Sequence, residues 1–354
     1  MTGERVPPDT LSPPRSAPRR ASLSSFNVRV SQLTGALLDQ RYKIHGYLSA
    51  GATSRVYLAE DLETSAAVVI KMLSPEASRD PMLRDRIASE ARAAVAVRHP
   101  NVVDVLGFGQ TPGGLPYLVM EALPGEPLDE VLRRVGRLPH DLSLVLARQA
   151  AAGLVATHAA GLIHRDVKPG NLLVLGAPDN PYGLKLLDYG MAQLWDAGLS
   201  SDAHTVVGTV EYMSPEQIVV EDVDPRSDVY SLGVVLFRLF TGHLPFESSV
   251  GPMVLRHQLF SPVPPPSWLD DQIDPRLEAV ILNATRKHPD NRYASMQELL
   301  DDLDAIVGLT SKDVAIRPLE HEPDVYEPRS ERGRDALDVL AHKFGPYATP
   351  PPPR

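Results

Sequence analysis

One short segment of the chain carries three side chains whose chemistry is complementary. It runs from His164 to Asn171 and reads HRDVKPGN. The carboxylate of Asp166 can accept a proton, the ammonium of Lys168 can stabilise a moving phosphoryl group, and the amide oxygen of Asn171 can bind a metal ion. The segment therefore predicts a phosphoryl-transfer loop, provided that other parts of the chain supply a nucleotide site and a second metal ligand.

Asp188 is the candidate for the second metal ligand. It follows the largely apolar run Leu184–Leu187 and precedes Tyr189 and Gly190, so a buried strand would release it into a turn. A carboxylate there would complement Asn171, whose neutral amide alone binds a cation weakly. An aspartate that caps the turn is the structural alternative. The spacing of seventeen residues from Asn171 (188 minus 171) favours the metal ligand.

Lys71 ends a β-type run of three apolar residues, Val68-Val69-Ile70. A lysine in that position is costly to bury unless an anion pairs with it. We expect the partner to be Glu90, which lies on the helical stretch from Pro81 to Arg98. The structural alternatives are that Lys71 reaches solvent and that Glu90 is a solvated helix residue.

The turn from Ser49 to Val56 is the candidate cover for the phosphates of a nucleotide. Its glycine, Gly51, has no Cβ and allows the backbone to approach a phosphate closely. An ordinary turn of small residues is the alternative. The small side chains of Ser49 and Ser54 still permit close approach, so we expect a stiffer or weaker phosphate cover rather than none.

Three charged residues farther along the chain are candidates for holding the site together. An ion pair between Glu216 and Arg292 would bind the segment after the metal loop to the helical part of the chain. Asp228 is predicted to cap a helix at its N-terminus and to bind the backbone of the segment around Asp166. The alternative for Glu216 and for Arg292 is a charge on the surface.

The pattern of apolar residues predicts two lobes of different composition. Short β-rich runs and one helical stretch lie between Tyr42 and about Met120. Long segments with helical periodicity follow from about Leu128. A connector near 121–125 would join them. This is an α+β, bilobal architecture, with a small N-terminal sheet lobe containing one main helix and a larger, mainly helical C-terminal lobe.

Both ends of the chain are rich in proline and polar residues. Residues 1–40 and most of 309–354 would bury too little apolar surface to offset their conformational entropy, so we expect disorder. Within the second segment, Leu337, Leu340 and Phe344 would share one face of a helix. That pattern fits either a docking helix or a transient turn in a flexible tail.

The composition excludes several classes of function. The 354 residues carry a net charge of −10, which argues against nucleic acid or an anionic membrane as the main partner. The chain has no cysteine, so disulfides and thiolate chemistry are excluded. The apolar run Leu232–Phe240 is too short for a membrane span and contains Arg238. We predict a cytoplasmic protein without a membrane span.

Taken in order along the chain, these residues resemble a bacterial, eukaryotic-like (Hanks-type) serine/threonine protein kinase. The resemblance covers about residues 41–308, with a small lobe at about 41–123 and a large lobe at about 124–308. Lys168, two residues after Asp166, resembles the serine/threonine-directed form of the catalytic loop. The chain departs from the pattern G-x-G-x-x-G-x-V of the phosphate-binding turn, because serine replaces both outer glycines. It also departs at Val69, where the family usually has alanine.

The resemblance implies transfer of the γ-phosphoryl group from ATP, with Mg²⁺, to serine or threonine of protein substrates. Asp166 would accept the proton and Lys168 would stabilise the transferred group. Asn171 and Asp188 would hold the metal. The residues implied at the ATP site are Ser49, Gly51, Val56, Val69, Lys71, Glu90, Met120, Glu121, Leu123 and Leu173. Those implied in structural or regulatory roles are Arg165, Tyr189, Glu216, Asp228 and Arg292.

The resemblance also implies regulation of the segment between Asp188 and Glu216. A phosphate on Ser200, Ser201 or Thr205 could order that segment through Arg165, and phosphorylation in trans would need transient self-association. Two alternatives to a protein kinase are a pseudokinase scaffold, favoured only by the glycine-poor turn, and a small-molecule phosphotransferase. The platform-like segment from Gly208 to Glu216 argues against the second alternative.

Overall fold

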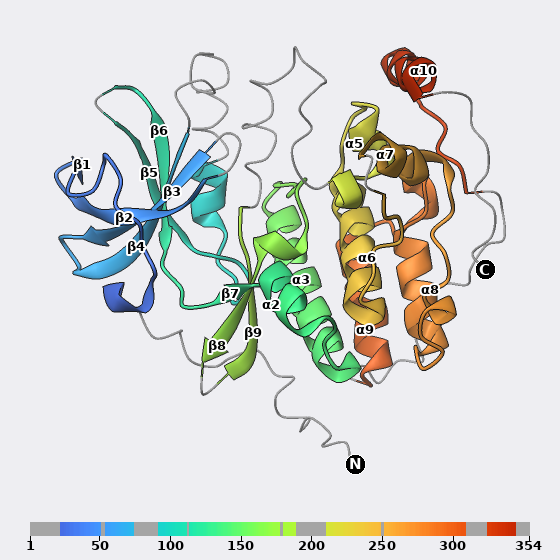
Figure 1. Ribbon diagram of the computed structural model, residues 1–354, viewed down its shortest axis with the longest axis horizontal. Helices are drawn as coiled ribbons and strands as arrows, with labels where there is room; N and C mark the ends of the chain where they lie inside the picture. The colour runs from blue at the N-terminus through green and yellow to red at the C-terminus, as the bar shows by residue number, and fades with distance from the viewer. Residues whose placement is uncertain are drawn as a thin grey trace.

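The structure is a computed structural model with a sheet-based lobe and a helical lobe side by side (Figure 1). The residues that it describes are 22–50, 54–73, 91–111, 113–177, 180–188, 210–248, 251–308 and 324–344. Gly51, Glu90, Tyr189, Ser200, Ser201 and Thr205 lie outside these ranges. Among the described residues, no helix combines the length and apolar character that crossing a bilayer requires.

The small lobe is built on one antiparallel sheet of order β1-β2-β3-β4-β6-β5. Its strands are β1 (Leu37–Leu38), β2 (Tyr42–Ala50), β3 (Ser54–Asp61), β4 (Ala66–Leu73), β5 (Val105–Gln110) and β6 (Pro116–Glu121). Alternate residues such as Tyr57, Ala59, Val68 and Ile70 form an apolar cluster on one face, as expected for strands with a period of two. Of the helix predicted for 81–98, residues 91–98 are described; 91–96 are helical, and the helix ends two residues earlier than predicted.

Residues 22–40 pack against this sheet. The disorder predicted for residues 1–40 is therefore wrong for this part of the segment. After a 3₁₀ turn, η2 (Leu23–Ser25), the backbone of Arg29 exchanges hydrogen bonds of 2.9 and 2.8 Å with Tyr47. Leu33 and Ala36 then pack on the apolar cluster of the sheet. These few apolar residues suffice because the sheet presents a complementary face, which the local composition of the segment does not reveal.

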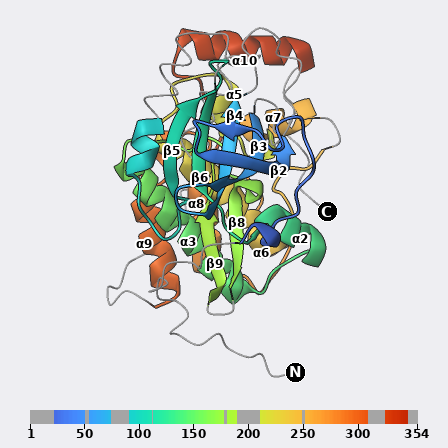
Figure 2. The same cartoon turned by 90° about the vertical axis from the view of Figure 1, so that its left-hand side faces the viewer.

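The large lobe consists mainly of helices, with the small sheet β7-β8-β9 on the side that meets the other lobe (Figures 1 and 2). Its strands are β7 (Glu126–Pro127), β8 (Leu172–Ala177) and β9 (Asn180–Leu186). Its helices are α2 (Leu128–Val135), α3 (His140–Ala159), α5 (Pro215–Ile218), α6 (Pro225–Thr241), α7 (Gly251–Phe260), α8 (Pro275–Ala284), α9 (Met296–Ile306) and α10 (Glu331–Phe344). Short 3₁₀ turns are η4 (Pro169–Asn171), η5 (Val210–Tyr212), η6 (Pro266–Trp268) and η7 (Pro289–Asn291).

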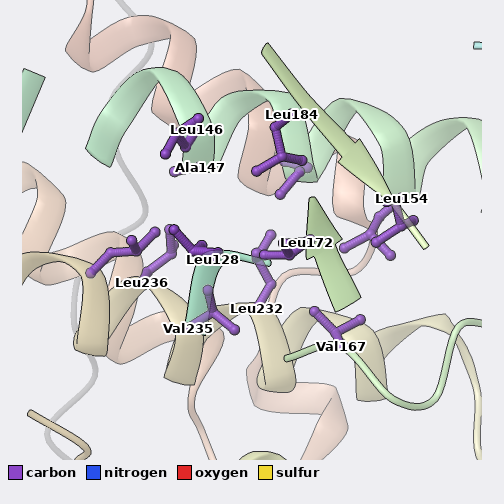
Figure 3. Close-up of a cluster of buried hydrophobic side chains, with 14 of the residues drawn as sticks. Leu128, Leu146, Ala147, Leu154, Val167, Leu172, Leu184, Leu232, Val235 and Leu236 are labelled. Atoms are coloured by element: carbon purple, nitrogen blue, oxygen red, sulfur yellow. The ribbon is translucent and has the colours of Figure 1, made fainter. Parts of the chain in front are cut away.

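Helix α6 lies at the centre of this lobe and is buried almost throughout. Asp224 caps its N-terminus by accepting a hydrogen bond from the Arg226 N–H, and Gly242 ends it in the left-handed conformation. Figure 3 shows Leu232, Val235 and Leu236 of α6 facing α3 residues across the core. This apolar layer fixes α3 and α6, the two helices that flank the HRDVKPGN segment.

The two lobes are joined by backbone pairing as well as by the connector. Residue Val103 donates a hydrogen bond of 2.9 Å to the carbonyl of Leu186 on β9, and Leu186 donates one of 2.8 Å to Asn101. The end of β9, two residues before Asp188, is therefore bonded to the segment that leads into β5 of the small lobe.

The C-terminal pattern predicted from Leu337, Leu340 and Phe344 lies on a helix, and the side chains of Leu340 and Phe344 lie outside the described ones. Helix α10 lies beside α5 and α7, and Ala336 and Leu337 pack on a small apolar cluster of the large lobe (Figure 1). Residues 309–323 and 345–354 lie outside the described ranges. The expectation of disorder is therefore wrong for 324–344.

Close packing of α6 against α8 leads to a first prediction. A Cβ at Gly233 would lie 2.7 Å from Cγ2 of Thr285 and 2.8 Å from Cβ of Ala284. Gly233→Ala should lower the free energy of unfolding by about 1–3 kcal/mol, the usual cost of overpacking a core, as measured by urea denaturation. Gly251→Ala is the control, because no atom lies within 4 Å of its Cβ position. Equal effects of the two substitutions would contradict this account of the packing.

A buried lysine near α6 leads to a prediction about pH. Nζ of Lys287 donates to the Tyr230 hydroxyl at 3.1 Å and lies 4.7 Å from the centre of the Phe246 ring. Burial, with a smaller contribution from Arg292, lowers the pKa of Lys287 to about 7, although Asp324 opposes the shift.

Because the folded-state pKa of Lys287 lies below the unfolded one, the unfolded chain binds more protons above pH 7. Relative to Lys287→Met, the wild type should therefore gain unfolding free energy as the pH rises from 7 to 9, by at most about 1.4 kcal/mol per pH unit. Denaturation of both proteins across this range measures the difference. Lys43→Met, at an exposed position, is the control. A flat difference between wild type and Lys287→Met would show that Lys287 is charged in the fold.

Candidate active site

The HRDVKPGN segment connects α3 to β8 and brings its three chemical groups into contact. Nζ of Lys168 lies 2.7 Å from Oδ2 of Asp166. Nδ2 of Asn171 donates to the same Oδ2 at 2.9 Å and to the Asp166 carbonyl at 2.8 Å. The three side chains predicted from the sequence are thus neighbours, and the Asp166 carboxylate is held through one of its two oxygens.

Buried Asp228 determines the conformation of this segment. Its carboxylate accepts hydrogen bonds of 2.8 Å from the backbone N–H groups of both His164 and Arg165, and it lies 2.7 Å from Nε2 of His158. Burial alone would raise the pKa of Asp228, but the bond with His158 and the backbone donors outweigh it, so the pKa lies below its ordinary value.

These bonds hold Arg165 at a φ of 66°, a left-handed conformation that is uncommon outside glycine. The predicted contact of Asp228 with this backbone is present. The predicted cap was wrong, because Asp224 caps α6 and Asp228 lies one turn inside it. Sequence reasoning also did not identify His158, which lies near the end of α3.

His164 connects the segment to Asp188. Its Nε2 lies 2.8 Å from the Leu187 carbonyl, and the Leu187 N–H donates to the Asn171 carbonyl at 2.9 Å. Asp188, the next residue, has a φ of 58°. The two predicted metal ligands, Asn171 and Asp188, therefore lie on backbone segments that are hydrogen-bonded to each other.

Lys71 of β4 forms an ion pair with Asp188, with 2.8 Å between Nζ and Oδ1. Desolvation acts to raise the pKa of Asp188, but the Lys71 ammonium outweighs it and keeps the pKa below its ordinary value. Lys71 is therefore paired with an anion, as the sequence predicts. The predicted partner, Glu90, lies outside the described residues, and the contact with Asp188 was not foreseen.

The predicted ATP residues of the small lobe lie on neighbouring strands. Across β2, β3 and β4, Ser49 is opposite Val56 and Val56 is opposite Lys71. Across β4 and β6, Val69 is opposite Met120. The structure thus brings these five positions together on one part of the sheet.

The connector contains an ion pair that sequence reasoning missed. Oε1 of Glu121 lies 2.5 Å from Nζ of Lys185 on β9 and accepts the Asp104 N–H at 2.8 Å. Lys185 is buried and also donates to the Val102 carbonyl at 3.1 Å. The only sequence signal was a lysine inside an apolar strand, which requires an anion. On β8, Leu173 lies opposite Lys185.

The predicted ion pair between Glu216 and Arg292 is present and fully enclosed. Each of the two carboxylate oxygens lies 2.7 Å from a guanidinium nitrogen, and the Ser227 hydroxyl donates to Oε1 at 2.5 Å. Burial acts to raise the pKa of Glu216, but Arg292 and Ser227 outweigh it and lower the pKa below its ordinary value. The remaining donors of Arg292 bind backbone carbonyls, among them that of Arg286 at 2.7 Å.

The Glu216 helix, α5, is also connected to the catalytic segment. Oε1 of Gln217 accepts the Ser214 N–H at 3.1 Å, and its Nε2 donates to the Arg165 carbonyl at 2.8 Å. Two consecutive residues of α5 thus connect Arg292 with the backbone beside Asp166, because Glu216 binds Arg292 and Gln217 binds the Arg165 carbonyl.

The comparisons with known proteins agree with this geometry. Residues 42–302 match the family model described as the protein kinase domain. The chain belongs to the protein kinase family. Serine/threonine-protein kinase PknB of Mycolicibacterium smegmatis is 40% identical over 273 residues, 75% of this chain and 43% of that protein. PknL of Mycobacterium tuberculosis is 35% identical over 274 residues, 77% of this chain and 67% of that protein.

The resemblance to bacterial, Hanks-type serine/threonine protein kinases is thereby confirmed. The chain spans less than half the length of the PknB relative. The crystal structure of a single-site mutant of the Mycobacterium tuberculosis PknI kinase domain superposes with a TM-score of 0.62 at 25% identity, covering 79% of this chain and all of that one. The predicted bilobal kinase fold is thereby confirmed.

The buried pair of this kinase domain leads to a further prediction. Glu216→Gln should lower the free energy of unfolding by about 3 kcal/mol or more, because it leaves the charge of Arg292 buried without a counter-ion. Chemical denaturation measures the loss. Arg133→Ala removes the partly exposed pair with Asp129 on α2 and should cost less than about 1 kcal/mol. Similar costs for the two substitutions would show that Glu216 does not compensate a buried charge.

Proposed function

We propose that this chain is an active serine/threonine protein kinase that transfers the γ-phosphoryl group of ATP to hydroxyl groups of protein substrates. The observation that carries the proposal is the contact of Lys168 and Asn171 with a single oxygen of Asp166. This arrangement fixes the carboxylate and directs its second oxygen to a substrate hydroxyl. The roles below follow from it and from the position of Lys71.

The reaction forms a bond between the substrate hydroxyl oxygen and the γ-phosphorus and breaks the bond to the bridging oxygen of ADP. Asp166 accepts the hydroxyl proton. Lys168, 2.7 Å from Asp166, stabilises negative charge on the transferred group. Lys71 orients the α- and β-phosphates from β4, where Val56 and Val69 flank the adenine. The backbone from Glu121 to Leu123 binds the adenine edge, and Leu173 covers its other face.

The residues at the metal position fit Mg²⁺, which prefers oxygen ligands. The low pKa of Asp188 keeps its carboxylate ionised. Because Asn171 uses Nδ2 to bind Asp166, its amide oxygen is available as a ligand. Bound there, the ion would neutralise charge on the triphosphate. Glu90, which lies outside the described residues, stays the predicted counter-ion of Lys71 for the state in which Asp188 would bind the metal.

Regulation belongs to the same proposal. A phosphate on Ser200, Ser201 or Thr205, added by a second copy during transient self-association, would neutralise Arg165 and order the segment before Glu216. The cytoplasmic location predicted from the sequence stays a prediction.

Substitution of the proposed proton acceptor tests the activity. Asp166→Asn should reduce transfer of ³²P from ATP to casein or myelin basic protein by about 10²–10⁴-fold, the usual contribution of a general base. Lys71→Met should reduce it as well, since the phosphates lose their orienting charge. Asp141→Asn, an exposed position on α3, is the matched control.

Two outcomes would contradict the proposal. Equal incorporation by wild type and Asp166→Asn would remove the assignment of Asp166. Tight binding of ATP and Mg²⁺ by a wild type that transfers no phosphate would instead indicate a scaffold. Thermal unfolding of each variant separates loss of activity from loss of fold.

A further inference from the structure

A segment beyond the matched kinase domain is bound to the large lobe. The family match ends at residue 302, whereas residues 324–338, here named the C-terminal strap, cross the end of the large lobe. Figures 1 and 2 show α10, which contains the end of the strap, beside α5. The strap is therefore an addition of this chain to the part that the family supplies.

Tyr326 anchors the strap. Its side chain is 1% exposed and packs in an apolar cluster with Val219 and Leu259. Its backbone N–H donates to the Leu259 carbonyl at 2.9 Å. The strap thus contacts both Val219, which directly follows α5, and Leu259 of α7.

Glu221 is the main polar contact of the strap. The Tyr326 hydroxyl donates to Oε2 of Glu221, while Ser330 donates to Oε1 from its N–H at 2.7 Å and its hydroxyl at 3.0 Å. The Ser330 hydroxyl also accepts the Gly333 N–H at 2.9 Å, which caps the first turn of α10. A Cβ at Gly333 would collide with the Glu221 carboxylate. The strap therefore provides a close-fitting site for this one side chain.

The backbone next to Glu221 is strained. Val220 has a φ of 57°, a conformation that β-branched residues rarely adopt. Its side chain is 53% exposed, so its own packing offers little to offset the strain. Its neighbours hold it instead, because Val219 is buried under Tyr326 and Glu221 is bound by the strap. The Glu221 N–H closes the turn by donating to the Glu216 carbonyl at 2.9 Å.

We propose that Glu221 is a positioning residue for protein substrates, and that Tyr326 and Ser330 of the strap hold it in place. The strap keeps residues 216–221 in the turn that presents Gln217 to the Arg165 carbonyl. It thereby acts on α5, whose Gln217 binds the backbone beside Asp166. The strap should not affect the residues of the small lobe that are proposed to bind the nucleotide. This inference rests on the proposed function for its kinetic part only, because the structural part concerns the turn itself.

Hydrogen exchange in the full chain tests the structural part. Tyr326→Phe keeps the buried ring and removes the hydroxyl that binds Glu221, so the backbone amides of Val220 and Glu221 should exchange about tenfold faster. Amides of α3 should not change. Ser330→Ala should have the same effect, and Asp335→Asn, an exposed change on α10, should have none. Unchanged exchange of 216–221 in Tyr326→Phe and Ser330→Ala overturns the proposal.

A second substitution separates strain from simple loss of stability. Glycine adopts a positive φ without strain, so Val220→Gly should restore slow exchange when it is combined with Tyr326→Phe. A double variant that exchanges as fast as Tyr326→Phe alone would show that the strap does not act by sustaining the strained turn.

Steady-state kinetics test the positioning role. Tyr326→Phe should raise KM for a protein substrate about tenfold, leave KM for ATP unchanged and change kcat less than twofold. Val220→Gly should reverse the rise in KM. Faster exchange with unchanged KM values would overturn the positioning role. A wild type without phosphoryl transfer would refute the proposed function, and the exchange experiment would still decide whether the strap holds the turn.

Discussion

The buried carboxylate of Asp228 is the constraint on which the candidate site depends. An ionised carboxylate inside the protein is costly unless donors surround it. Here two of its donors are consecutive backbone N–H groups, those of His164 and Arg165. The segment can satisfy the charge only by following one path, and that path includes a left-handed Arg165. The electrostatic need of one side chain therefore determines where the carboxylate of Asp166 lies.

The same logic extends outward from α6 in two directions. Toward the small lobe, His164 lies next to the carbonyl of Leu187, which directly follows β9, and Lys185 within β9 binds Glu121. Toward the far end, the Arg165 carbonyl binds Gln217, whose neighbour Glu216 is held by Arg292. Charged groups with low exposure are joined to backbone atoms at each step, so the loops acquire fixed positions without regular secondary structure.

Sequence patterns predicted contacts between residues that are close in the sequence. They missed several contacts between residues that are far apart in the sequence. The spacing within HRDVKPGN is short, so the contacts among Asp166, Lys168 and Asn171 could be predicted from residue type. The pair between Glu121 and Lys185 joins strands of different lobes, and nothing near either residue specifies the other. The cap of α6 was misplaced for a different reason. Asp224 and Asp228 are both suitable caps, and the local signal that favours Asp224, a proline at the first position of the helix, was not used.

The C-terminal strap illustrates the same limit. Tyr326 and Glu221 are separated by 105 residues, and a polar, proline-containing segment has no reason to fold until that distant carboxylate is present. The helical periodicity of Leu337, Leu340 and Phe344 in α10 indicated a face that could dock, but it did not identify the surface. The N-terminal segment is similar, since Leu33 and Ala36 pack on a sheet whose strands come later in the sequence.

Two buried cations near α6 show how residue type matches the electrostatic setting. Arg292 cannot release its proton, and the fold gives it the bidentate carboxylate of Glu216 together with backbone carbonyls. Lys287 has a hydroxyl and aromatic rings around its ammonium, and there the pKa falls instead. Lysine can tolerate such a place because it can become neutral, whereas arginine in the same place would remain an uncompensated charge. The two residues are therefore not interchangeable, and the anchor of α5 requires the one that stays charged.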